Sequence, residues 1–347
     1  MKDILSFTPD ELREEMKAHS EPAFRGKQIF SWLHEKRVRT FDEMTNLPKT
    51  LRETLSSTYE IMTLSVLECL SSSDGTRKYL LRLPDGHVIE SVFMRYSYGN
   101  SVCVSTQVGC RMGCRFCAST LNGLVRNLRA SEILSEIYTI EKDTGLPVNH
   151  IVLMGSGEPL DNYEEVVRFL RLVTDENGKN LSARNITLST CGIPDKILSL
   201  AGEGLPVTLA LSLHAPDDET RRGLMPIAKR YPLSEVLAAC DAYFEKTGRR
   251  VSYEYSVVKG VNDTEEEAEK LSELLHGKNA HVNLIPVNPI EERNFESPGE
   301  RGIRAFYKVL EKMGINATIR KSMGADIDGA CGQLRRHYLD AADKESD

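Results

Sequence analysis

The stretch that decides the fold of this chain is Cys103-Val104-Ser105-Thr106-Gln107-Val108-Gly109-Cys110-Arg111-Met112-Gly113-Cys114-Arg115-Phe116-Cys117. A run typical of a β-strand leads into a loop with three cysteines, Cys110, Cys114 and Cys117, spaced Cys-x3-Cys-x2-Cys. Three thiols this close together predict a metal site, because core cysteines would not cluster by accident. Gly109 and Gly113 allow the backbone to wrap tightly, since glycine tolerates positive φ.

The number of thiols limits the kind of metal. Structural zinc takes four ligands, and no second cysteine pair or nearby histidine completes such a set. A four-thiolate electron-transfer cluster needs a fourth cysteine, for which the only nearby candidate is Cys103, on the predicted strand. Both alternatives stay open. The interpretation we favour is a 4Fe–4S cluster held by three thiolates, whose fourth iron is open to an external ligand.

Downstream of this stretch, short β-rich runs alternate with helical patterns. We predict strands at 102–108, 150–154, 185–189, 207–213, 251–257, 281–286 and 317–320, and helices at 130–143, 163–174, 194–201, 233–246, 264–275 and 299–313. This alternation is typical of parallel βαβ units and predicts an α/β fold, either a barrel or a doubly wound sheet. Active sites in such folds lie at the carboxyl ends of the strands.

The N-terminal third has a different pattern. Residues 1–60 read as a helical module, in which Thr8-Pro9-Asp10-Glu11 carries an N-cap, a proline at the first helical position and a glutamate three residues after the cap. Residues 61–100 read as a β meander with a hairpin turn at Asp85-Gly86. We expect the main unit to span 101–339, followed by a frayed acidic tail at 340–347.

Composition excludes several protein classes. The 347 residues are 40 % hydrophobic and 27 % charged, which is ordinary for a soluble globular protein. The longest strictly apolar runs are far shorter than the ~20 residues that span a bilayer, and no signal-peptide core is present. We therefore expect no membrane partner and a cytoplasmic location, where the eight cysteines would not form a disulfide framework.

The charge distribution keeps a polyanionic partner open. The net charge of −7 argues against nucleic-acid binding, but residues 22–52 hold seven Lys or Arg against three acids. Aromatic residues that suit base stacking lie within this basic segment, although they are equally suited to the module's own core: Phe24, Phe30, Trp32, His34 and Phe41. Later basic pairs, such as Arg221-Arg222, read as solvated surface.

Further motifs follow the cysteine loop in a fixed order. They are Ala118-Ser119-Thr120, Arg126-Asn127-Leu128, Met154-Gly155-Ser156-Gly157-Glu158-Pro159, Leu188-Ser189-Thr190, Ser212-Leu213-His214-Ala215-Pro216, Leu284-Ile285-Pro286-Val287-Asn288-Pro289 and Ala330-Cys331-Gly332-Gln333-Leu334. Together with the cysteine loop, they resemble the RlmN/Cfr family of radical S-adenosylmethionine RNA methyltransferases, and the RlmN type most closely. The resemblance implies a partial (β/α)6 barrel with a 4Fe–4S cluster on Cys110, Cys114 and Cys117.

The same resemblance implies where S-adenosylmethionine binds. Glu158 offers a carboxylate to the ammonium group of the cofactor, and Ser189, Ser212 and His214 lie at strand ends where they reach its carboxylate and ribose. In the family the cofactor contacts fall on positions matching Gly157, Glu158, Ser189, Ser212, Leu213, His214 and Asn288. Read without the family, each of these residues is also compatible with a purely structural role.

The chemistry implied by the resemblance uses two S-adenosylmethionine molecules per turnover. The first methylates Cys331, and the second yields a radical that removes a hydrogen atom from that methyl group. The resulting carbon adds to adenine, Glu90 removes the ring proton, and Cys103 forms a disulfide with Cys331 as the product leaves. From the local sequence alone, Glu90 reads as an exposed strand residue.

The resemblance also implies partners. These are an adenosine of 23S rRNA, the adenosine that follows the anticodon in tRNA, and a flavodoxin-like electron donor. Two rival functions stay open: methylation of adenine carbon 8, as in the Cfr type, and a non-enzymatic RNA-binding metalloprotein. We expect Cys69, Cys191 and Cys240 to be core or bystander thiols, although Cys191 could line the cofactor pocket.

Overall fold

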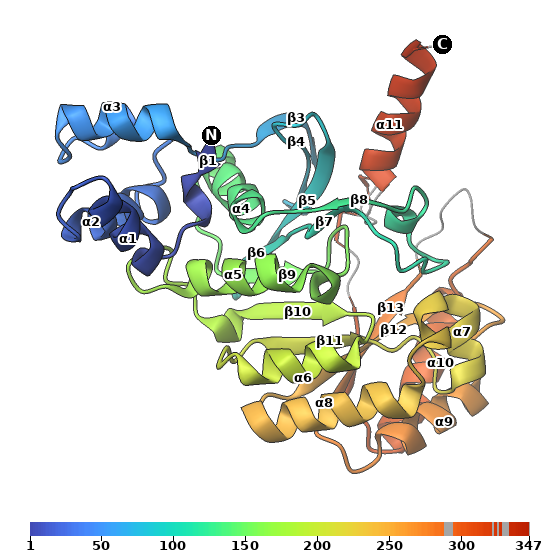
Figure 1. Cartoon of the computed structure of the whole chain (residues 1–347). Helices are drawn as coiled ribbons and strands as arrows, with labels where there is room; N and C mark the ends of the chain where they lie inside the picture. The colour runs from blue at the N-terminus through green and yellow to red at the C-terminus, as the bar shows by residue number, and fades with distance from the viewer. Residues whose placement is uncertain (288–293, 321–322, 325, 328–332, 347) are drawn as a thin grey trace.

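A ten-stranded sheet organises the chain. The computed structural model describes residues 1–287, 294–320, 323–324, 326–327 and 333–346. Within these residues the strand order is β14-β13-β12-β11-β10-β9-β6-β5-β4-β3 (Figure 1). The neighbouring strands from β6 to β14 pair in parallel: β6 (Gly99–Cys103), β9 (His150–Leu153), β10 (Ile186–Thr190), β11 (Thr208–Ser212), β12 (Val251–Val257), β13 (Ala280–Pro286) and β14 (Ala317–Ile319).

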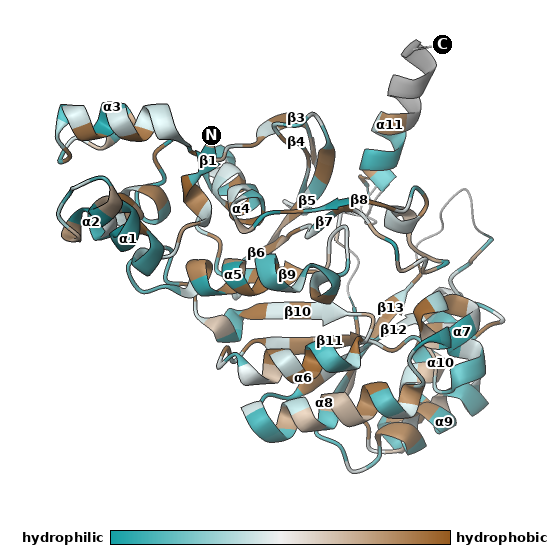
Figure 2. Cartoon of the chain, viewed as in Figure 1, coloured by the Kyte–Doolittle hydropathy of each residue, from teal (hydrophilic) through white to brown (hydrophobic). Residues whose placement is uncertain are grey.

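Helices connect these parallel strands, so the predicted α/β fold is confirmed. They are α4 (Ala130–Thr144), α5 (Tyr163–Thr174), α6 (Pro194–Gly202), α7 (Asp218–Leu224), α8 (Leu233–Thr247), α9 (Glu265–Leu275) and α10 (Gly299–Lys312). Hydrophobic and hydrophilic residues alternate around α5, α6 and α8 (Figure 2). The apolar side of each helix joins the core, as residues such as Phe169, Ile197 and Val236 show.

The meander continues this sheet instead of forming a separate unit. Strands β3 (Ser65–Ser71), β4 (Arg77–Arg82) and β5 (Val88–Tyr96) are antiparallel, and β5 pairs directly with β6. The residues predicted as one strand over 102–108 form two, β6 and β7 (Gln107–Gly109), and β7 pairs with β8 (Leu124–Asn127). The ladder breaks because the amides of Thr106 and Gln107 both donate to the carbonyl of Ser156.

The N-terminal module consists of α1 (Pro9–Ala18), α2 (Phe24–His34) and α3 (Lys49–Thr58), followed by β2 (Tyr59–Glu60), which pairs with β1 (Lys2–Asp3). The capping box predicted at the start of α1 is present, because Thr8 Oγ1 accepts from the Glu11 amide and Glu11 accepts from the Thr8 amide. Arg168 of α5 donates to Glu11, which ties the module to the main sheet. One hydrophobic cluster runs through both parts, so the predicted division at residue 60 stays a prediction.

The C-terminal helix differs from the expected frayed tail. Helix α11 runs from Gln333 to Ser346 and projects from the body of the molecule (Figure 1). Its first turn is anchored on β5: the Arg335 amide donates to Glu90 Oε1 at 2.6 Å, and Arg335 Nε donates to the Val88 carbonyl at 2.8 Å. Leu334 packs with Leu80 and Val88 in a small apolar cluster. These contacts place the start of α11 beside the meander.

Candidate active site

The register of the sheet gathers several predicted site residues on one face. Val92 of β5 and Val152 of β9 both pair with Cys103. Directly paired residues point to the same side of a sheet, and every second residue of a strand returns to that side. Counting across the remaining strands identifies four predicted site residues on this side, which we call the interior face: Glu90, Cys103, Ser189 and Ser212.

Glu90 is buried in the sheet, so its interpretation as an exposed strand residue is wrong. Its side chain faces Lys78 on the neighbouring strand, with Lys78 Nζ 3.5 Å from Glu90 Oε2, and both side chains are almost completely buried. The other carboxylate oxygen accepts from the Arg335 amide. A buried carboxylate persists when a cation and hydrogen bonds stabilise it, and Glu90 has both.

Of the two thiols in the predicted disulfide chemistry, Cys103 lies among the described residues and Cys331 does not. Cys103 is buried on the interior face of β6. Cys331 and Asn288 lie outside the described residues. No disulfide joins any of the cysteines within the described ranges. Described residues on either side of Cys331 are bound to the meander: Asp326 accepts from the Ser72 hydroxyl and the Ser73 amide, and the Arg335 amide donates to Glu90.

The cysteine loop is held by backbone hydrogen bonds. Gly109 has φ +78°, and the Cys110 amide that follows it donates to the Gly123 carbonyl at 2.9 Å. Thr120 Oγ1 donates to the carbonyls of both Cys114 and Cys117, which curls the loop around this hydroxyl. These contacts fix the positions of all three cysteines relative to one another.

The three thiols are close enough to influence one another. Burial, and then the neighbouring Cys117, raise the pKa of Cys110 to about 12. Burial together with Cys117 and Cys110 raises the pKa of Cys114 well above its usual value. Across the described ranges, no group of three His, Cys, Asp or Glu side chains converges enough to hold a metal ion. A 4Fe–4S cluster makes a different demand, because its thiolates bind separate irons instead of meeting on one ion as zinc ligands do.

The turn after β9 brings Glu158 to the cysteine loop. Gly157 has φ +111°, and a Cβ there would lie 2.7 Å from the Gln107 amide nitrogen, so only glycine fits. Glu158 accepts hydrogen bonds from the amides of Leu160 and Cys191, and its burial raises its pKa. A buried carboxylate of this kind suits the ammonium group of an amino-acid ligand.

Strand ends supply the remaining predicted contacts. Ser189 and Ser212 are half-buried on the interior face. Leu213 is fully buried, and its amide donates to the Glu254 carbonyl. His214 has φ +57°, accepts at Nδ1 from the Ser256 amide, and has its pKa lowered to about 3 by burial. The neutral ring therefore carries its proton on Nε2, where it serves as a donor.

The chain is similar to known proteins over almost its whole length. The family model described as the radical SAM superfamily matches residues 104–273, and the ribosomal RNA large subunit methyltransferase N-terminal domain matches residues 2–61. A "Probable dual-specificity RNA methyltransferase RlmN" from Lachnoclostridium phytofermentans is 58 % identical over 97 % of this chain and 95 % of that protein. A protein of the same name from Clostridium perfringens strain 13 is 56 % identical over 98 % of each chain. The chain belongs to the RlmN family.

A solved structure supports this membership. The crystal structure of a radical SAM methyltransferase from Sphaerobacter thermophilus has a TM-score of 0.91 and 43 % identity, over 96 % of this chain and 99 % of that chain. The protein is therefore a radical S-adenosylmethionine RNA methyltransferase, with a 4Fe–4S cluster and S-adenosylmethionine as its cofactors. The rival reading as a non-enzymatic metalloprotein is wrong. Among the described residues, no helix has the length and apolarity needed to cross a membrane.

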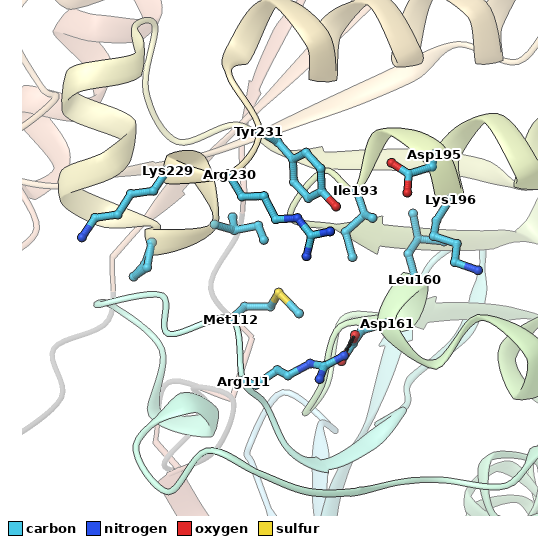
Figure 3. A pocket seen from close by; sticks show the side chains of 12 residues that line it. Arg111, Met112, Leu160, Asp161, Ile193, Asp195, Lys196, Lys229, Arg230 and Tyr231 are labelled. Atoms are coloured by element: carbon cyan, nitrogen blue, oxygen red, sulfur yellow. Dashed lines mark hydrogen bonds and ion pairs between the residues drawn. The ribbon is translucent and has the colours of Figure 1, made fainter.

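A cavity of about 700 Å³ lies beside the cysteine loop of this RlmN-family chain. Arg111 and Met112 of the loop form one side, and Arg230 and Tyr231 face them across the opening (Figure 3). Arg111 Nε donates to Asp161 at 2.9 Å. The cations that line the cavity outnumber its carboxylates: Arg111, Lys196, Lys229 and Arg230 against Asp161 and Asp195.

The N-terminal aromatics fall into two groups. Phe30, His34 and Phe41 are buried, and Trp32 is partly buried with its indole N–H donating to Asn46, so these four serve the module's structure. Phe24 is 57 % exposed, and the guanidinium of Arg25 lies 5.0 Å from its ring centroid. Only Phe24 remains accessible for stacking with a base.

Sequence reasoning missed two buried cations near the site. Lys78 lies in the predicted β meander, where no role was assigned to it, and Arg221 belongs to a basic pair interpreted as surface. Arg222 is exposed, but Arg221 is fully buried. A signal existed for Arg221, since in a helix it lies on the same side as Leu224, three residues later. Of the three other cysteines, Cys69 is exposed and Cys240 is buried in α8, whereas Cys191 is buried beside Glu158.

Proposed function

We propose that this enzyme methylates carbon 2 of adenosine in 23S rRNA and in tRNA, the latter 3′ to the anticodon. The observation that carries the proposal is the setting of Glu90: a buried carboxylate on the same face as Cys103, with the start of α11 hydrogen-bonded to it. This setting supports a single site that contains a base, a thiol and the segment that follows Cys331. The dual-specificity RlmN relatives favour carbon 2 over the carbon 8 chemistry of the Cfr type.

Cys110, Cys114 and Cys117 hold the cluster in this proposal, and Glu158, Ser189, Ser212 and His214 orient the cofactor, with Gly157, Leu213 and Asn288 completing its contacts. When bound, the cluster supplies the electron that cleaves S-adenosylmethionine to a carbon radical. The fit rests on the donor set, because three neighbouring thiols lie beside the buried Glu158 carboxylate. Iron binding requires the thiolate forms, so each of these three cysteines would lose its proton when the cluster binds.

The remaining residues handle the methyl group and the protons. Cys331 accepts a methyl group from one S-adenosylmethionine and presents it to the radical, which removes one hydrogen atom. The carbon adds to the adenine, and Glu90 accepts the proton that leaves carbon 2. Cys103 then loses its proton and attacks the sulfur of Cys331, so that the sulfur–carbon bond breaks and a disulfide forms. The released carbon takes up one proton to complete the methyl group, and the one unpaired electron would return to the oxidised cluster. A reductant, for which we propose a flavodoxin-like protein, restores the two thiols.

The N-terminal module contributes RNA contact. Phe24 and Arg25 at the start of α2, together with the exposed Lys27, offer an aromatic ring beside positive charge. This combination suits unstacked bases and their phosphates. A target adenosine has to leave its stack to reach the interior face, which favours loop regions of rRNA and tRNA. An RNA-modifying enzyme of this kind works in the cytoplasm.

The direct test analyses the nucleosides of rRNA and tRNA from cells that lack the endogenous enzyme and express this chain. We expect 2-methyladenosine in both RNA fractions, and its absence from cells that express the Glu90→Gln variant. Finding 8-methyladenosine instead would support the Cfr-type activity and overturn the carbon 2 proposal. Methylation of rRNA alone would overturn the tRNA part.

A further inference from the structure

Arg221 occupies an unusual position in α7. It heads the large side chains that are completely buried within the described residues. Its Nη2 donates to the carbonyls of Cys191 at 2.7 Å and Ser212 at 3.3 Å, and its Nε donates to the carbonyl of Leu213 at 3.2 Å. These acceptors are the ends of β10 and β11, where the predicted cofactor contacts lie. Arg221 therefore holds a positive charge underneath the cofactor site.

No carboxylate lies within ion-pair distance of this charge in the described part of the chain. All three hydrogen-bond acceptors of Arg221 are neutral carbonyls, and its Nη1 is buried without a hydrogen bond. The neighbouring carboxylates are used elsewhere, as Asp217 caps the Thr220 amide and Asp218 accepts from the Leu233 amide. An unpaired buried ion costs several kcal/mol, so a folded protein retains one only when something compensates.

The groups that can compensate are the loop cysteines, once they are thiolates. Burial raises the pKa of Cys114, and the Arg221 charge opposes that rise, as expected for a cation close to this thiol. Helix α7 is also tied to the cysteine loop, because the Arg115 amide donates to the Leu224 carbonyl at 2.9 Å. The Phe116 ring packs edge-on against His214, with 4.7 Å between ring centroids. The loop and the arginine therefore form one packed unit.

We propose that Arg221 is the built-in countercharge of the iron–sulfur cluster and raises its reduction potential. The inference rests on the proposal that Cys110, Cys114 and Cys117 hold the cluster. Loading the site turns neutral thiols into thiolates, which supply the negative charge that the guanidinium lacks. A fixed cation stabilises the reduced cluster more than the oxidised one, because the reduced form carries one more negative charge. Arg221 is thus a positioning and tuning residue that does not touch the RNA.

The test compares Arg221→Met with Arg221→Lys, and uses Arg222→Met, on the exposed side of α7, as the control. Both Arg221 variants lose the planar guanidinium group that donates to the three carbonyls, but lysine keeps the positive charge. Iron per chain and the midpoint potential are measured on reconstituted protein without S-adenosylmethionine. At the wild-type midpoint we expect Arg221→Met to lower the ratio of reduced to oxidised cluster at least tenfold, which is about 59 mV for one electron. Arg221→Lys and Arg222→Met should each change that ratio less than about threefold.

The outcomes separate the alternatives. If Arg221→Met loses its iron and Arg221→Lys retains it, the charge is still the cause and the inference stands. Equal effects of the two Arg221 variants, or none, would make Arg221 a structural clamp and overturn it. A weaker affinity for S-adenosylmethionine at an unchanged potential would overturn it in favour of a pairing with the cofactor carboxylate. If the wild-type protein binds no iron, the proposed cluster site fails instead.

Discussion

Replacing Gly109 by alanine tests whether the conformation of the cysteine loop requires glycine at this position. Gly109 has φ +78°, and an added Cβ would lie 2.1 Å from the Gly123 carbonyl oxygen, which is too close to be accommodated without movement. That same oxygen accepts the hydrogen bond from the Cys110 amide. The substitution therefore displaces the Gly123 carbonyl and weakens the hydrogen bond that positions Cys110, the first ligand of the predicted cluster.

Gly123→Ala is a matched control. Gly123 has φ +66°, so alanine is strained there too, but a Cβ at this position would meet nothing within 4 Å. The left-handed conformation costs both variants about 1–2 kcal/mol. Gly109→Ala adds a lost hydrogen bond of about 1 kcal/mol and overpacking of about 1–3 kcal/mol. The free energies of unfolding of the two variants should differ by about 2–4 kcal/mol.

Chemical denaturation of the iron-free proteins measures this difference, and iron per chain after anaerobic reconstitution measures its consequence. We expect Gly109→Ala to lose most of its iron and Gly123→Ala to retain it. Equal stability and equal iron content of the two variants would show that the Gly123 carbonyl does not constrain position 109, because only the clash with it distinguishes them.

Three further predictions concern the base, the RNA contact and the module. Glu90→Gln should accumulate a covalent protein–RNA adduct, seen as an RNA-dependent shift of the protein on denaturing gels. The control Glu68→Gln, on the surface strand β3, should form no such adduct. A Glu90→Gln variant that is inactive but forms no adduct would contradict the role of Glu90 as the base. Phe24→Ala should weaken RNA binding at least about fivefold, equivalent to about 1 kcal/mol of lost stacking, and Leu198→Ala, another exposed apolar residue, should leave it unchanged. Burial lowers the pKa of His34 to about 3. Below pH ~6.5 the unfolded chain therefore binds the proton that the folded chain excludes, and about 2 kcal/mol of stability should be lost between pH 7 and pH 5. In His34→Phe that part of the pH dependence should vanish, and an unchanged slope would rule out His34 as its source.

The sequence predicted the repeating part of the fold well because each strand and helix there carries its own signal. Strand β12 and helix α5 have the predicted bounds, since apolar runs and helical periodicity mark them without help from the rest of the chain. The break between β6 and β7 was not predictable from local pattern, because it depends on the Ser156 carbonyl, which lies far along the chain.

The site was predictable where its residues are clustered in sequence or shared with a family. The cysteine loop and the turn at Gly157 are of this kind. Glu90 shows the limit, because its neighbours suggest an exposed strand, and only the pairing with Lys78 and α11 reveals a buried carboxylate. Arg221 is similar, since its burial comes from contacts with β10 and β11 and not from the residues next to it.

In the proposed reaction the methyl group reaches RNA through Cys331, as a carbon that has lost one hydrogen atom. The decisive experiment supplies S-adenosylmethionine whose methyl group is fully deuterated and determines the mass of the methyladenosine released from the RNA product. Transfer through Cys331 predicts a methyl group with two deuterium atoms, because the radical has removed the third. A methyl group that retains all three deuterium atoms would show direct transfer from S-adenosylmethionine and exclude the route through Cys331.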